Sequence, residues 1–120
     1  MKENVVKVKS FAFAVRVVKL ARFLQTEKRE FVISKQVVRS GTAIGAMVRE
    51  AEHAESKADF IHKMSIALKE ANETLYWLEL LQASEYLDRT GYESIAADSE
   101  ELLRLLVAIV KTSKGANRVD

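Results

Sequence analysis

Two short motifs carry the residue types of a metal site. Glu50 and His53 form a Glu-x-x-His sequence, and Asp59 and His62 repeat that spacing with a shorter acid. Di-iron helical bundles combine two such motifs with one glutamate from each of the other two helices. The segment 11–25 contains no Asp or Glu, so one required ligand is missing. We therefore expect no bound metal and no cofactor, with both histidines solvated or ion-paired.

A second candidate for chemistry is the carboxylate pair Glu70 and Glu73. Two carboxylates can share general acid–base work when a concave pocket holds them beside a substrate. Tightly packed helices offer no such pocket, and the chain has no cysteine to act as a nucleophile. We expect these acids to form ion pairs with Arg39 or Arg49 on a neighbouring helix. The sequence thus predicts no catalytic residues and no enzymatic activity.

The third candidate is a set of cations on the first two helical segments. Arg16, Lys19 and Arg22 follow one another at intervals of three, which places them in one stripe on a helix. Lys35 and Arg39 lie on the polar side of the next segment. Phosphate backbones bind such surfaces without sequence specificity, and the binding weakens steeply with salt. The pattern predicts that these five residues contact RNA or DNA.

Charge is divided unevenly along the chain. Residues 1–50 hold 11 Lys and Arg against 4 Asp and Glu, whereas residues 51–120 hold 8 against 13. A basic half favours an anionic partner or docking between copies, although a solvated face is an equally open interpretation. The alternative function is a scaffold that docks an acidic partner protein without nucleic acid.

Helical periodicity without any strand alternation defines the elements that must position these residues. Four segments at residues 10–26, 31–54, 57–84 and 91–113 predict an all-α, antiparallel, up-down-up-down four-helix bundle in a single domain over residues 1–120. We expect Ser10 to cap the first helix. Capping boxes at Ser56/Asp59 and Thr90/Glu93 are expected to open the third and fourth helices.

Gly41 and Gly45 stand four residues apart in RSGTAIGA, inside the second helical segment. A glycine costs a helix roughly 0.5–1 kcal/mol relative to alanine, so two of them need a reason. Small residues at this spacing let a neighbouring backbone approach closely. A phosphate-binding glycine loop would need a preceding strand and a helix N-terminus, and neither is present. We predict close helix packing at both glycines.

The first helical segment is apolar around about two-thirds of its circumference, more than the stripe of ~100° that a surface helix buries. Such a surface needs a second subunit or lipid, and no apolar run reaches the roughly 20 residues that span a bilayer. We therefore expect a homo-oligomer and no membrane insertion. The absence of cysteine makes a reducing cytoplasm the expected compartment.

The segments RSGTAIGA and DFIHKMSIALKEANETLYWL resemble the four-helix-bundle family named for 23S rRNA intervening sequences. FAFAVRVVKL and LLRLLVAIVKTSK extend the resemblance over nearly the whole chain. Met47 stands where that family usually has asparagine, which weakens any polar role for this position.

The resemblance implies a small bundle that assembles into a ring, commonly a homopentamer. It also implies similarity to the accessory protein of diversity-generating retroelements, a basic pentamer that partners a reverse transcriptase and nucleic acid. The family supplies no catalytic residues, which agrees with the expectation that the chain is not an enzyme.

Overall fold

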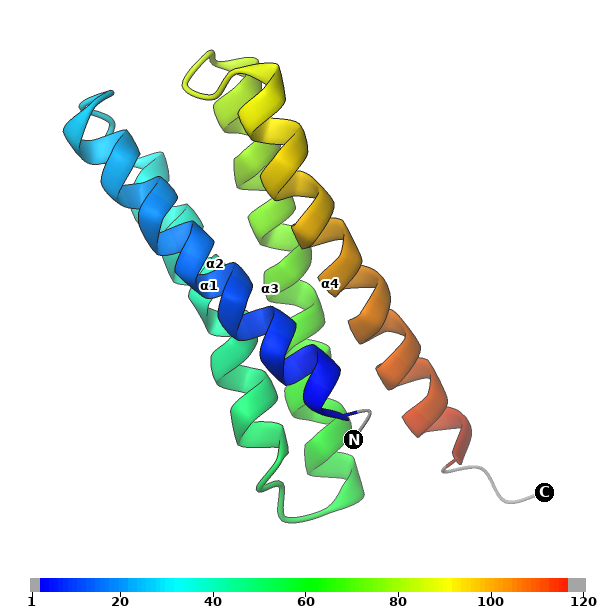
Figure 1. Cartoon of the computed structure of the whole chain (residues 1–120). Coiled ribbons are helices and arrows are strands. Elements are labelled where there is room, and N and C mark those ends of the chain that lie inside the picture. Colours follow the sequence, from blue (N-terminus) through cyan, green and yellow to red (C-terminus); the bar gives the residue numbers. More distant parts are fainter. Residues whose placement is uncertain (1–2, 117–120) are drawn as a thin grey trace.

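The computed structural model describes residues 3–116 and contains four α-helices joined by short links. They are α1 (Glu3–Thr26), α2 (Ile33–Ala51), α3 (Lys57–Ala83) and α4 (Arg89–Ala116). Each helix packs against the next one along the chain, and α4 returns to meet α1 over a shorter contact (Figure 1). This is the predicted all-α, up-and-down bundle. The ends of the predicted domain, residues 1–2 and 117–120, lie outside the described part of the chain.

The first helix begins earlier than residue 10, and the prediction that Ser10 caps it is wrong. α1 already starts at Glu3, and Ser10 is fully buried inside it. Its hydroxyl donates to the carbonyl oxygen of Lys7 at 3.1 Å, one turn back. A serine can satisfy its hydroxyl within a helix in this way, so the same residue type that favours a cap is also tolerated in the interior.

The second helix is shorter than the predicted 31–54 at both ends. It begins at Ile33, and its N-cap residue, Val32, makes no side-chain capping bond. It ends at Ala51, where the backbone tightens into three-residue turns: the Glu52 amide bonds the Arg49 carbonyl oxygen at 3.2 Å. Tightened final turns are a common way of satisfying the last carbonyl groups of a helix.

The predicted cap of the third helix is confirmed. The Asp59 amide donates to Ser56 Oγ at 3.0 Å, and the Asp59 carboxylate accepts the Glu55 amide at 3.1 Å. The prediction for the fourth helix is wrong, because Asp88 rather than Thr90 provides the cap. Its Oδ1 accepts the Gly91 amide at 2.7 Å, and α4 therefore starts two residues earlier than expected and runs three residues further, to Ala116.

A continuous apolar core fills the space between the helices. In α1 the buried positions recur at intervals of three and four residues, which keeps them on one face of the helix. The core side chains are Val6, Phe13, Val17, Leu24, Val37, Ile44, Val48, Ala51, Met64, Ala67, Ala71, Leu78, Leu81, Ile95, Leu102, Leu106 and Val110.

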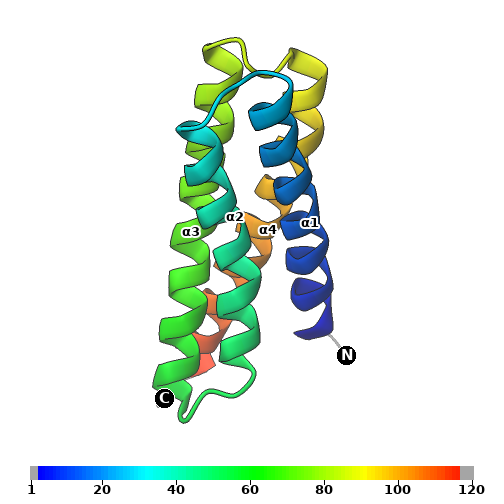
Figure 2. The same cartoon turned by 90° about the vertical axis from the view of Figure 1, so that its left-hand side faces the viewer.

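The bundle is a rod of 54 × 23 × 22 Å. The α1–α2 link and the α3–α4 link lie together at one end, and the α2–α3 link lies at the other (Figures 1 and 2). Over residues 3–116, no helix combines the length and the apolar content that crossing a membrane requires.

Candidate nucleic-acid interface

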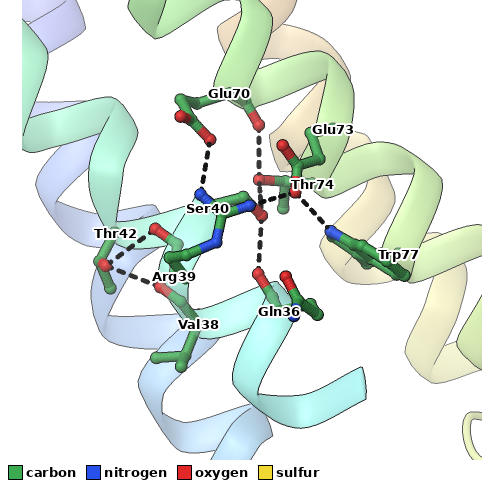
Figure 3. A network of polar contacts seen from close by, with 9 residues as sticks. All are labelled: Gln36, Val38, Arg39, Ser40, Thr42, Glu70, Glu73, Thr74 and Trp77. Atoms are coloured by element: carbon green, nitrogen blue, oxygen red, sulfur yellow. Dashed lines mark hydrogen bonds and ion pairs between the residues drawn. The ribbon is translucent and has the colours of Figure 1, made fainter. Parts of the chain in front are cut away.

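Arg39 on α2 is held by two carboxylates of α3, which confirms the ion pairs expected for Glu70 and Glu73. Its guanidinium forms a salt bridge with Glu73 and lies 3.7 Å from Glu70 Oε1 (Figure 3). The indole Nε1 of Trp77 donates to the same Glu73 carboxylate at 2.9 Å. The positive charge of Arg39 is therefore balanced within the chain, and the two acids serve to join α2 to α3.

Buried hydroxyl groups continue this network into the α2–α3 seam. The Thr74 hydroxyl lies 2.9 Å from Ser40 Oγ and 2.7 Å from the carbonyl oxygen of Glu70 (Figure 3). Ser40 in turn donates to the Gln36 carbonyl oxygen at 3.1 Å. Both side chains are fully buried, and a buried hydroxyl is tolerated when such partners are present.

Arg16 is also engaged inside the molecule. Its Nη1 donates to Asp98 Oδ2 at 2.7 Å and to the Ser94 carbonyl oxygen at 3.2 Å, and its Nη2 donates to Ser94 Oγ at 2.9 Å. Two turns closer to the start of α1, Lys9 pairs with Glu101 at 3.1 Å. Arg16 thus joins α1 to α4, and its guanidinium has several fixed partners.

The other three predicted residues, Lys19, Arg22 and Lys35, are exposed. With Lys28 and Arg29 of the α1–α2 link they form the basic corner, which we define as these five cations. Within residues 19–35 the one exposed carboxylate is Glu27, and Glu85 and Asp88 of the α3–α4 link line a hollow together with Lys28. The structure therefore separates the predicted cations into two that bind acids of neighbouring helices and three that extend into solvent at one end of the rod.

The second acid of this stretch, Glu30, points inward and caps α2. Its Oε2 accepts the amides of Val32 (3.0 Å) and Ile33 (2.8 Å), and its Oε1 accepts the Ser34 amide at 2.7 Å. The first amides of a helix lack intrahelical partners and carry partial positive charge, so a carboxylate there is favoured. Because three amides of α2 bind its carboxylate and its side chain is only 7% exposed, Glu30 does not form ion pairs with the cations outside.

The link reaches this arrangement through an unusual backbone conformation at Arg29. This residue has φ of 57°, in the left-handed region that favours glycine. Its neighbour Lys28 places Nζ 5.8 Å from the centroid of the Phe23 ring, within the range of a cation–π contact.

Gly41 and Gly45 lie where α1 crosses α2. A β-carbon added at Gly41 would come within 2.8 Å of both γ-methyl groups of Val17, whereas one at Gly45 would make an ordinary 3.5 Å contact with the Ser10 carbonyl oxygen. The close approach of α1 therefore requires a glycine at position 41. At position 45 it leaves room for one methyl group.

Comparisons with known proteins place this geometry in a family. The 23S rRNA-intervening sequence protein family matches residues 2–108 of the chain. The chain belongs to this family. Among curated proteins, none matches it.

A solved structure of the same fold supports that membership. It is the crystal structure of a protein of unknown function from the S23 ribosomal protein family of Bacteroides thetaiotaomicron. The two sequences are 63% identical, the match covers 92% of this chain and 99% of the other, and the TM-score is 0.91. The position at which this member of the 23S rRNA-intervening sequence protein family departs from the expected pattern, Met47, is partly buried against the core, which suits an apolar residue.

The two metal-like motifs of this family member have structural partners instead. The Glu50 carboxylate pairs with Lys63 Nζ at 2.9 Å, and Asp59 belongs to the cap of α3. His53 and His62 are both exposed. Within the described residues, no three His, Asp or Glu side chains come together in a way that could hold a metal ion.

Two side chains have shifted pKa values, and both shifts move away from neutrality. The hydrogen bond that Lys63 donates to Glu50, together with the negative charge of Glu50, raises the pKa of the Lys63 ammonium. Burial, followed by the carboxylates of Glu79, Glu100 and Glu93, raises the pKa of the Tyr92 hydroxyl. Lys63 thus stays protonated and Tyr92 stays neutral at pH 7, which gives neither group an acid–base role there.

Sequence analysis did not identify the aromatic residues at the end of the rod where the α1–α2 and α3–α4 links lie. Phe23 is 40% exposed beside Lys28, and Tyr86 lies on the α3–α4 link near it in space. The signal available in the sequence was Phe23 followed by a run of charged residues, FLQTEKRE. Its proximity to Tyr86 depends on the tertiary fold.

Proposed function

We propose that this protein is a non-catalytic, self-associating helical bundle that binds nucleic acid through the basic corner. The observation that carries the proposal is the balance of exposed charge over residues 19–35, where five cations accompany one carboxylate. Lys and Arg side chains that neutralise phosphates release condensed counterions, which supplies most of the free energy of non-specific binding. The corner offers this electrostatic contact without a fixed arrangement for reading base edges.

Arg16 and Arg39 each pair with a carboxylate of the chain, which leaves fewer cations for the proposed contact surface. This pairing partly neutralises each positive charge before it meets a phosphate group. We therefore assign the phosphate contacts to Lys19, Arg22 and Lys35, with Lys28 and Arg29 beside them. Several such corners in one assembly would multiply weak individual contacts through avidity.

Self-association is supported by an apolar stripe on the outer face of α1. Val8, Phe11, Val15 and Val18 are all exposed, Phe11 by 63%, and their spacing of three and four residues keeps them on one face. A contiguous exposed patch of this kind is typical of an interaction site. A second copy of the chain is the proposed partner, and a homopentameric ring is the arrangement that the family resemblance favours.

The charge experiment is a titration of labelled RNA or DNA by fluorescence anisotropy at several salt concentrations. The variant Lys19→Gln/Arg22→Gln removes two charges from the corner, whereas Lys111→Gln/Lys114→Gln removes two exposed charges from the last turns of α4. We expect the first pair to weaken binding and to reduce the salt slope by roughly 1.5–2, and the second pair to change little. Affinity that is independent of salt would contradict the proposal.

The same titration separates the proposal from the scaffold alternative. A scaffold that docks an acidic partner protein predicts no direct binding of purified nucleic acid at any salt concentration. A reverse transcriptase as partner would add a protein contact to the nucleic-acid contact, so binding of the purified nucleic acid would remain measurable.

Sedimentation tests the assembly. We expect a species several times larger than the 13.5 kDa chain at micromolar concentration. The variant Phe11→Ser/Val15→Ser should shift it toward the single chain, because both side chains are exposed and the core stays intact. A wild-type protein that sediments only at 13.5 kDa would rule out self-association.

A further inference from the structure

A hollow of about 540 Å³ opens at the same end of the rod as the basic corner. Phe23 and Lys28 line it from the α1 side, and Tyr86, Leu87 and Arg89 line it from the α3–α4 link and the start of α4. Figures 1 and 2 show the two links that border this end of the bundle. The volume lies within the range of sites that bind small molecules or single chemical groups.

Phe23 and Lys28 line the hollow together. Lys28 Nζ stands over one face of the Phe23 ring, 5.8 Å from its centroid. A flexible, exposed lysine can leave the ring and follow a phosphate group, since its stem has several rotatable bonds. An incoming flat group would then occupy the ring face that the ammonium now covers.

The opposite wall of the hollow is held in place by backbone hydrogen bonds. The amides of Tyr86 and Leu87 both donate to the Leu81 carbonyl oxygen, at 2.8 and 3.2 Å. Of the two acids that line the hollow, Asp88 is engaged in capping α4 through Gly91. Glu85, the other acid that lines the hollow, is exposed, and its carboxylate has no hydrogen-bond or salt-bridge partner among residues 3–116.

We infer that this hollow binds an unpaired base of a single-stranded nucleic acid, stacked on Phe23, with the adjoining phosphate groups on Lys28 and Arg22. The inference rests on the proposed function and deepens it by naming the class of nucleic acid. Aromatic side chains next to a cationic path are the usual platform for single strands, because every base offers a stacking face. In a duplex these faces are already stacked on neighbouring base pairs, so a duplex can use only the charges.

The test compares three ligands of about 12 nucleotides: a single-stranded RNA, its duplex, and a strand of the same length without bases. We expect the wild-type protein to bind the single strand at least about fivefold more tightly than the other two, the loss that removal of one base–aromatic stack produces. Phe23→Leu should abolish this preference and leave the salt slope unchanged. Phe23→Trp, which keeps a stacking surface, should retain it.

Phe31→Leu is the matched control, because Phe31 is an exposed phenylalanine of the α1–α2 link that does not line the hollow. It should retain the preference for the single strand. Equal binding of all three ligands, together with loss of affinity in Lys19→Gln/Arg22→Gln, would overturn the stacking inference and leave the proposed function standing. Absence of binding to every ligand would overturn both.

Discussion

Helix α1 meets its two neighbours in opposite ways. Against α2 it approaches closely, with the methyl groups of Val17 directly over Gly41 and the surrounding side chains buried. Against α4 the contact is shorter and is bridged by charged side chains, with Arg16 reaching Asp98 and Lys9 reaching Glu101. At the α1–α2 seam a glycine without a side chain lets the helices approach closely. At the α1–α4 seam long charged side chains connect the two helices.

The difference shows how packing determines which cations are available to a ligand. The α1–α2 seam uses one charged pair, Lys7 with Glu52 at its far end, and leaves the cations at the end of α1 in solvent. The α1–α4 seam is bridged by Arg16, whose guanidinium binds Asp98 and is therefore less available to a ligand. The corner is therefore basic partly because the α1–α2 seam does not need its charges.

The largest expected effect comes from filling the close seam. Gly41→Val should reduce the free energy of unfolding by about 3 kcal/mol, because its side chain would overlap the rigid, fully buried Val17. Chemical denaturation measures this change.

The matched control is Gly45→Ala, which meets only an ordinary contact and gains helix propensity, so we expect a stabilisation of about 0.5–1 kcal/mol. Equal destabilisation by the two substitutions would show that the close approach is not specific to position 41.

The next largest effect is expected at Glu30, which caps the start of α2. Glu30→Ala should cost about 2 kcal/mol, because three backbone amides at the start of α2 lose their acceptor. Glu27→Ala, at the exposed first position of the same link, should stay within about 0.5 kcal/mol of wild type in thermal or chemical unfolding. A loss at Glu27 that matched the loss at Glu30 would contradict the assignment of Glu30 as the cap.

A smaller change of opposite sign is expected on α4. Ser99 is fully buried, and its Oγ has no hydrogen-bond partner among the described residues. Ser99→Ala should therefore raise the free energy of unfolding by about 1 kcal/mol, since it removes an unpaired polar group and improves helix propensity. Destabilisation by Ser99→Ala would show that the hydroxyl has a partner in solution.

The smallest effect on stability is expected at the α1–α4 seam. A variant there also tests the difference between the two seams of α1. Asp98→Asn should cost only about 0.5 kcal/mol, because the Arg16–Asp98 pair is partly exposed. The released charge of Arg16 should strengthen the binding of RNA or DNA measured by anisotropy. Glu50→Gln, which breaks the pair with Lys63 near the opposite end of the rod, is the control of equal charge change. If the two variants bound nucleic acid alike, the position of the released charge would not matter.

The sequence predicted those features that depend on local periodicity and spacing. The four helices and the cap at Ser56 belong to this group, because neighbouring residues determine them. The start of α1 was misplaced because Ser10 has the residue type of a cap and the segment before it alternates charged and apolar residues. The cap at Asp88 was missed because Thr90, two residues later, fits the same pattern.

The candidate interface was less predictable, because it depends on contacts between distant segments. Periodicity placed Arg16 and Lys19 in one stripe, but only the fold shows that Arg16 faces Asp98, 82 residues away. Glu30 was counted as a charge that offsets the basic half, whereas the structure turns it inward as a cap. The hollow beside Phe23 joins two links that are far apart in the sequence.

The backbone conformation at Arg29 has a consequence for how this surface can evolve. A glycine at this position would relieve roughly 1 kcal/mol of unfavourable left-handed geometry and would also delete one of the five cations of the corner. Position 29 therefore cannot provide both the higher stability of a glycine and the positive charge of an arginine. Variants selected only for heat tolerance should drift toward glycine here and bind polyanions less tightly.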